Sequence, residues 1–138
     1  NYPDPEVLDI AMRDILHKHH VDLVVLAGFM KRIGPKTLAA FEGRIINIHP
    51  ALLPRHGGKG MYGRKVHEQV LAAGDSETGV SVHVVTDDYD TGTILAQQTV
   101  PVLAGDTPDI LAHRVLELEH RIYVETIAKI INGELRLS

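Results

Sequence analysis

Asn47 and His49 stand at the end of an apolar run, in the segment IINIHPALLP at positions 45–54, and a proline follows them at once. Residues i and i+2 of a strand point to the same side, so both side chains can project together from the carboxyl end of a strand. In open parallel sheets, ligands bind at the carboxyl ends of the strands. An amide donor beside a titratable imidazole suits acyl transfer to an amine, because the carbonyl oxygen gains negative charge during the reaction.

The same two side chains have other uses, which the residues alone leave open. Asn47 can be an ordinary turn former, His49 can satisfy a backbone carbonyl, and together they can hold a phosphate or a metal ion. We expect no metal ion, because His49 is the one good zinc ligand at this point of the chain and hard cations prefer several carboxylates.

A carboxylate beside an imidazole favours the charged form of the ring. The segment TDDYDTG at 86–92 offers three such groups, on Asp87, Asp88 and Asp90. Aspartates ahead of a Thr-Gly pair are more often turn residues. Nothing in the local sequence distinguishes Asp90 from Asp87 and Asp88 as the carboxylate beside the imidazole.

The first half of the chain alternates predicted helices with predicted buried strands. Helical spacing of apolar residues, with Pro5 in the first turn, predicts a helix that runs to about His19. The short apolar run at 22–28 suits a parallel strand, a short helix is expected within 35–43, and a second buried strand at 44–49.

The second half predicts two helices and two further strands. A helix through Val66 should end at Gly74, residues 78–87 and 93–102 alternate as strands do, and a long helix should run from Thr107 toward Gly133. The pattern indicates an α/β protein with a doubly wound, mainly parallel sheet. A chain that begins with a helix and lacks an opening strand with a glycine-rich turn is expected to lack the N-terminal βαβ part of such a sheet.

Composition limits the classes of function. A chain of 138 residues with 44% hydrophobic residues is about one domain with a core of ordinary size. The net charge is −4 and no run of Lys or Arg could follow a nucleic-acid backbone, so we expect no nucleic-acid partner. The sequence has no cysteine, no long apolar span and no apolar leader, which predicts a cytoplasmic protein without a membrane partner.

Four segments resemble the phosphoribosylglycinamide formyltransferases, the folate-dependent enzyme family of purine synthesis. They are VVLAGFMKRIGP, IINIHPALLP, TGVSVHVVTDDYDTGTILAQQTVPV and LEHRIY, and together the resemblance covers nearly the whole chain in register. It implies that residues 1–138 are the C-terminal portion of a catalytic domain with the formyltransferase fold. Family members begin with a strand and a glycine-containing turn that holds the ribonucleotide phosphate, and we expect that phosphate site to be missing from this segment.

The resemblance also implies roles for individual residues. Asn47 and His49 match the amide and imidazole that stabilise the oxyanion, with His49 also supplying a proton, and Asp90 matches the aspartate that keeps the imidazole charged. Glu119 matches an acid that contacts the ribose of glycinamide ribonucleotide. The residues that match the family's folate pocket are Met30, Lys31, Arg32, Ile33, Asn47, Val85, Thr86, Asp87 and Asp90. Lys31 and Arg32 depart from the pattern of many members, in which one basic residue is followed by two apolar ones.

The implied reaction is direct transfer of the formyl group of 10-formyltetrahydrofolate, as co-substrate, to the amine of glycinamide ribonucleotide, without a metal. Two alternatives stay open: a hydrolase that deformylates the same folate, and a folate-binding or nucleotide-binding module without turnover. The oligomeric state is also open, with a homodimer as one option.

Overall fold

The computed structural model describes residues 4–29 and 31–137. Met30, one of the residues assigned to the folate pocket, lies outside the described residues. The elements follow in the order α1 (Pro5–Lys18), β1 (Val24–Val25), α2 (Pro35–Ala40), β2 (Ile45–His49), α3 (Arg64–Ala72), β3 (Glu77–Val84), β4 (Ile94–Pro101) and α4 (Pro108–Ile131). Every predicted helix and strand is therefore present, which confirms the α/β class.

The sheet is mixed, and the expectation of a mainly parallel sheet is wrong for the described residues. The strands lie in the order β1-β2-β3-β4, and β1 pairs with β2 in parallel. The β2–β3 and β3–β4 pairs are antiparallel. Buried apolar runs look alike in parallel and antiparallel strands, so the sequence pattern could not fix strand direction.

β1 is much shorter than the predicted strand at 22–28, since only Val24–Val25 has strand pairing. The N–H groups of Val24 and Leu26 donate to the carbonyls of Arg44 and Ile46, at 2.8 and 2.9 Å. The Tyr123 hydroxyl, on α4, contacts the carbonyl oxygens of Leu26 and Ile46 at 2.6 and 3.2 Å. α4 thus ties the end of β1 to β2 as well as packing on the sheet.

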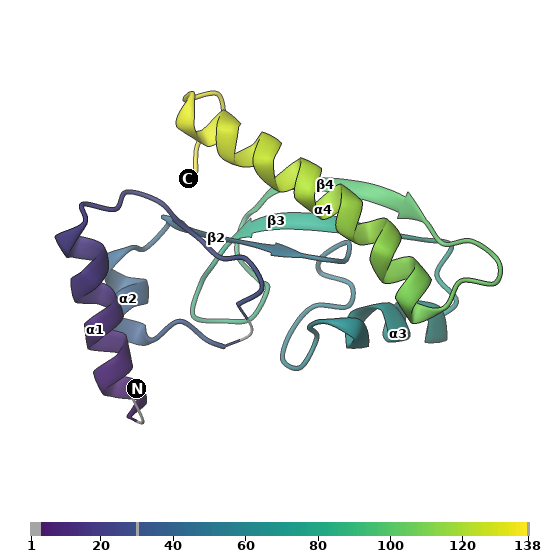
Figure 1. The fold of residues 1–138 in the computed structure, drawn as a ribbon, viewed down its shortest axis with the longest axis horizontal. Coiled ribbons are helices and arrows are strands. Elements are labelled where there is room, and N and C mark those ends of the chain that lie inside the picture. The colour runs from purple at the N-terminus through teal and green to yellow at the C-terminus, as the bar shows by residue number, and fades with distance from the viewer. Residues whose placement is uncertain (1–3, 30, 138) are drawn as a thin grey trace.

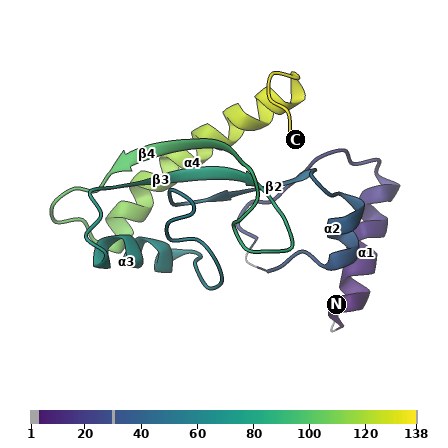
Figure 2. The ribbon, with the colours of Figure 1, turned by 180° about the vertical axis from the view of Figure 1, so that it is seen from behind.

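One face of the sheet is apolar and is covered by α4. The helix crosses in front of the sheet in Figure 1 and behind it in the reverse view of Figure 2. Four apolar residues that recur at helical spacing along α4 are buried against apolar residues of β2, β3 and β4 and form the core with them: Leu111, Val115, Leu118 and Ile122 against Ile46, Val80, Val82 and Val100.

α1 and α2 lie side by side at one end of the sheet (Figures 1 and 2). Two residues of the predicted apolar stripe of α1, Val7 and Ile15, remain exposed in the described structure. None of the helices within residues 4–29 and 31–137 is long and apolar enough to cross a membrane.

The buried residue of α1 is an acid, Asp9, which caps the neighbouring helix α2. Its carboxylate accepts the backbone N–H groups of Lys36 and Thr37, at 2.8 and 2.9 Å, and the Thr37 hydroxyl at 2.7 Å. The N-cap residue of α2 is Gly34, whose lack of a side chain leaves room for this carboxylate, since a Cβ there would overlap it. Burial raises the pKa of Asp9, but these hydrogen bonds outweigh it and hold the pKa below its ordinary value.

Replacing Asp9 by alanine should destabilise the fold by about 2 kcal/mol, because two helix N–H groups lose their only side-chain acceptor. Chemical denaturation at pH 7 measures this loss. Asp14→Ala, on an exposed position of the same helix, is the matched control and should change stability by less than about 0.5 kcal/mol. Equal effects of the two substitutions would contradict the capping role.

Candidate active site

Asn47 and His49 lie at the carboxyl end of β2 and line the same cavity, of about 450 Å³. In the antiparallel ladder Asn47 is opposite His83 and His49 is opposite Ser81, both on β3. Because side chains alternate along a strand, these four polar residues share the face of the sheet that α4 does not cover. The predicted common projection of Asn47 and His49 is therefore what the structure has.

The turn after His49 is held by two polar side chains from β3 and β4. The Ser81 hydroxyl, fully buried, donates to the carbonyl of Ala51 at 2.8 Å and accepts the N–H of Leu53 at 3.1 Å. Gln97 donates to Ser81 Oγ and to the Leu53 carbonyl, at 2.9 and 3.1 Å. No sequence pattern indicated this role, since both residues look like the polar positions of ordinary alternating strands.

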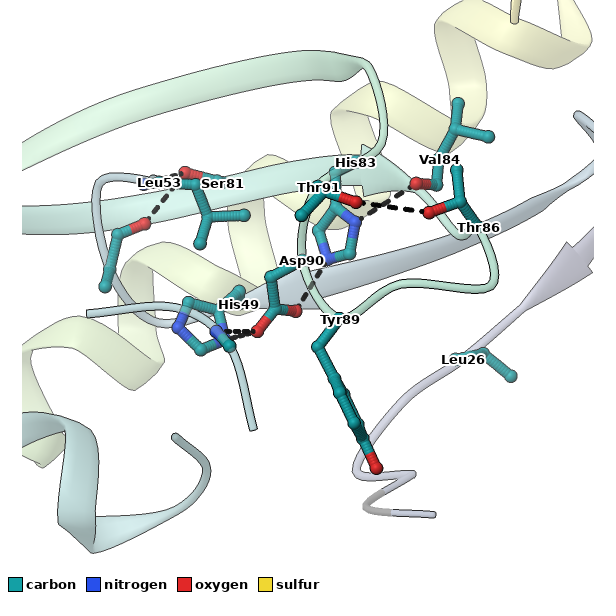
Figure 3. Close-up of polar contacts among 12 residues, drawn as sticks. Leu26, His49, Leu53, Ser81, His83, Val84, Thr86, Tyr89, Asp90 and Thr91 are labelled. Carbon is teal, nitrogen blue, oxygen red and sulfur yellow. Dashed lines mark hydrogen bonds and ion pairs between the residues drawn. The ribbon is translucent and has the colours of Figure 1, made fainter. Parts of the chain in front are cut away.

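Asp90 is the aspartate of its loop that reaches the two histidines (Figure 3). Its Oδ2 lies 3.8 Å from His49 Nδ1 and its Oδ1 lies 3.5 Å from His83 Nε2. Oδ2 also accepts the backbone N–H of Gly58 at 2.9 Å. Asp87 and Asp88 are exposed, so the geometry distinguishes Asp90 where the local sequence could not.

His49 is 4% exposed and both of its ring nitrogens face acceptor oxygens. Nε2 donates to the backbone carbonyl of His56 at 2.8 Å, while Nδ1 faces the Asp90 carboxylate. Only a ring that carries a hydrogen on each nitrogen offers a donor to both oxygens. His49 thus lines the larger cavity with its ring held between a backbone carbonyl and the Asp90 carboxylate.

His83 is buried under the loop that carries Asp90. Nδ1 donates to the carbonyl of Val84 at 3.3 Å, and Nε2 has the Asp90 carboxylate as its nearest charged neighbour. Burial lowers the pKa of His83, and the contacts with Val84 and Asp90 only partly offset that effect. A neutral His83 gives the Asp90 carboxylate no charged partner from β3.

A second, smaller cavity of about 60 Å³ lies on the other side of Asn47 and Asp90, which line both cavities. It is bounded by two segments that the sequence assigned to the folate pocket. Of the assigned residues, the structure brings Arg32, Ile33, Val85 and Thr86 to this cavity together with Asn47 and Asp90, while Lys31 and Asp87 line neither cavity.

Tyr89 stands between the two cavities and lines both. The Arg32 guanidinium lies 4.9 Å from the centre of its ring, in a cation–π contact that joins the two loops around the smaller cavity. No pattern in the sequence pointed to Tyr89, because its role depends on the meeting of two segments far apart in the chain.

The larger cavity is closed by α3, by α4 and by the glycine-rich loop 58–63. Glu119 reaches it from α4, and burial raises the pKa of this carboxyl to about 7. His67 reaches it from α3, and its pKa is lowered by burial and by the nearby His49. Among the residues that the structure describes, no three His, Asp or Glu side chains are grouped to hold a metal ion.

Comparison with known proteins shows which families this chain is similar to. Residues 2–127 match the family described as formyl transferase. The chain is 51% identical over 123 residues to the chloroplastic phosphoribosylglycinamide formyltransferase of Arabidopsis thaliana, covering 89% of this chain and 42% of that protein. It is 41% identical over 128 residues to the Escherichia coli K12 phosphoribosylglycinamide formyltransferase, covering 91% of this chain and 58% of that protein.

A solved structure has the same arrangement of elements. The crystal structure of phosphoribosylglycinamide formyltransferase from Streptococcus pneumoniae superposes with a TM-score of 0.86 at 39% identity, covering 95% of this chain and 70% of that one. The chain thus spans about half the length of the sequence relatives named above and has the α/β formyltransferase fold over its described part. The chain belongs to the formyl transferase family.

Proposed function

We propose that this chain carries the catalytic centre of a phosphoribosylglycinamide formyltransferase, which moves the formyl group of 10-formyltetrahydrofolate to the amine of glycinamide ribonucleotide. The observation that carries the proposal is the position of Asn47 and Asp90 at the junction of two cavities, with His49 against Asp90. A group transfer between two substrates needs such a junction. The names of the relatives support the choice of substrates.

In the proposed reaction the ribonucleotide amine, in the larger cavity, attacks the formyl carbon. A carbon–nitrogen bond forms, and the carbonyl oxygen takes up negative charge that Asn47 and His49 stabilise. A proton then passes from the attacking nitrogen to N10 of the folate, by way of water, as the bond between N10 and the formyl carbon breaks. Asp90 keeps the imidazole charged, and no step passes through a metal ion.

The folate is proposed to bind along the smaller cavity, between the segment of Arg32 and Ile33 and the loop of Val85 and Thr86. Glu119 is proposed to accept hydrogen bonds from the ribose in the larger cavity.

Product analysis with and without the ribonucleotide tests this function. Formylated ribonucleotide that appears only when both substrates are present supports the transferase. Release of formate from the folate without the ribonucleotide would support the hydrolase. Binding of the folate or the nucleotide without turnover would support a binding module. The cytoplasmic location stays a prediction, and the Arabidopsis relative carries "chloroplastic" in its name.

Asp90→Asn should lower kcat at neutral pH by about 100-fold to 10,000-fold while folate binding changes little, since the carboxylate acts on the charge of His49. Steady-state kinetics and the pH profile of kcat measure this. Asp87→Asn provides the contrast, because Asp87 was assigned to the folate pocket but lines neither cavity, and it should alter kcat by less than about 3-fold. An unchanged pH profile in Asp90→Asn would contradict the role of Asp90.

Asn47→Ala should lower kcat by about 100-fold to 1,000-fold and raise KM far less, because its amide donates to a charge that exists only near the transition state. Asn47→Asp keeps the shape but cannot donate, so it should lose at least as much. A change in KM alone would make Asn47 a binding residue.

Glu119 should make ribonucleotide binding depend on pH, because its pKa of about 7 lies within the working range. The ionised carboxylate is the better acceptor for ribose hydroxyls, so the KM for the ribonucleotide should fall as pH rises from 6 to 8. Glu119→Gln should bind more weakly at pH 8 and lose this dependence. A pH dependence that persists in Glu119→Gln would assign it to another group.

The stability of the free protein provides an independent check on Glu119. Because the folded pKa is raised above the ordinary 4.5, the protonated form stabilises the fold below pH 4.5 and this contribution is lost as pH rises through 7. Glu119→Gln cannot ionise, so its stability relative to the unchanged chain should increase over that interval.

A further inference from the structure

Asp75 has a buried carboxylate outside both cavities, in the turn that follows α3. Its side chain is 8% exposed, and neither of the two cavities includes it. One carboxylate oxygen accepts His56 Nε2–H at 2.7 Å and the other contacts the Arg55 guanidinium at 3.0 Å. Arg55 is 62% exposed, whereas the His56 side chain is 18% exposed, so the His56 contact is the better shielded of the two.

His56 is also one of the few non-glycine residues with a positive φ, at +55°. A residue with a Cβ avoids this region unless its surroundings hold it there. The contact with Asp75 is the hydrogen bond that the His56 side chain makes in the described structure. The backbone of His56 is thus fixed in a rare conformation by a carboxylate from another part of the chain.

The short segment 56–58 touches both members of the candidate catalytic pair. The His56 carbonyl accepts Nε2–H of His49 at 2.8 Å, and the Gly58 N–H donates to Asp90 Oδ2 at 2.9 Å. The first contact fixes which side of the imidazole faces Asp90, and the second fixes the carboxylate that it faces. A shift of this segment would therefore move His49 and Asp90 relative to each other.

We propose that Asp75 and His56 are positioning residues for the His49–Asp90 pair. Asp75 holds the imidazole of His56, this contact fixes the left-handed backbone of His56, and that backbone orients the ring of His49 and the carboxylate of Asp90. Neither residue touches the substrates. This inference rests on the proposed function only for its kinetic test.

The kinetic test uses the protein as it exists, with single substitutions. Asp75→Asn replaces the carboxylate that accepts from the His56 ring by a neutral amide, and His56→Asn removes that ring while tolerating the left-handed conformation at position 56. Each should lower kcat by about 10-fold to 100-fold, with the KM of both substrates unchanged within about 2-fold, because a small misplacement of catalytic groups reduces the rate rather than binding. Arg55→Ala removes only the exposed partner of Asp75 and is the matched control, with kcat within about 2-fold of the unchanged protein.

Double variants separate positioning from a general loss of stability. If Asp75 acts through His56, the double variant Asp75→Asn/His56→Asn should be no slower than the slower single variant. If both act through the catalytic pair, Asp75→Asn should cost little further activity in an Asp90→Asn background. Additive losses in that background, or a loss of kcat that merely follows the folded fraction in thermal unfolding, would overturn the proposal.

A spectroscopic measurement tests the same idea without turnover. Imidazole nitrogen NMR of the unliganded protein should show the His49 ring signals shifted in Asp75→Asn and unchanged in Arg55→Ala. Unshifted His49 signals in a folded Asp75→Asn protein would overturn the positioning role. A protein that transfers no formyl group would instead contradict the proposed function, and the NMR result would still decide the role of Asp75.

Discussion

The Asp90 carboxylate is the group on which the arrangement of this site depends. Its side chain is only 12% exposed, and a shielded charge is costly unless donors surround it. Three separate segments meet around it: the N–H of Gly58 donates to it at 2.9 Å, and the rings of His49, at the end of β2, and His83, on β3, lie 3.8 and 3.5 Å away. Their meeting requires the observed β2–β3 register, the turn after β2 and the loop after β3 at the same time, so a change in any one of them would leave the charge poorly compensated.

One face of the sheet carries the apolar core, and the other carries the polar residues of the candidate site. Alternation places Ile46, Val80 and Val82 on the face that α4 covers, and the neighbouring residues on the opposite face are Asn47, Ser81 and His83. A register shift of one residue would exchange the two sets, burying the polar side chains under α4 and losing the apolar core together with the site. Hydrophobic burial on one face therefore fixes the position of the polar groups on the other.

Periodicity predicted the elements well because it reports burial, which is local in sequence. It found α4 and its buried stripe, and it placed Asn47 and His49 at a strand end. Other features depend on segments that meet only in the folded chain. These are the direction of the strands, the choice of Asp90 rather than Asp87 or Asp88 as the aspartate beside the histidines, and the contacts made by Ser81, His56 and Tyr89. For Asp90 a family resemblance supplied what the local sequence lacked, whereas none of our sequence arguments suggested a role for His56 or Tyr89.

Strained backbone in the described chain lies mostly beside the candidate catalytic histidine. Three non-glycine residues have positive φ, His20, His56 and Asp90. His20 follows the C-terminal end of α1, where a left-handed residue is an ordinary way to end a helix. His56 and Asp90 instead flank the two nitrogens of His49, and polar contacts to Asp75 and Gly58 hold them. The two left-handed residues beside His49 therefore lie where its orientation is decided, and contacts from other parts of the chain hold both of them.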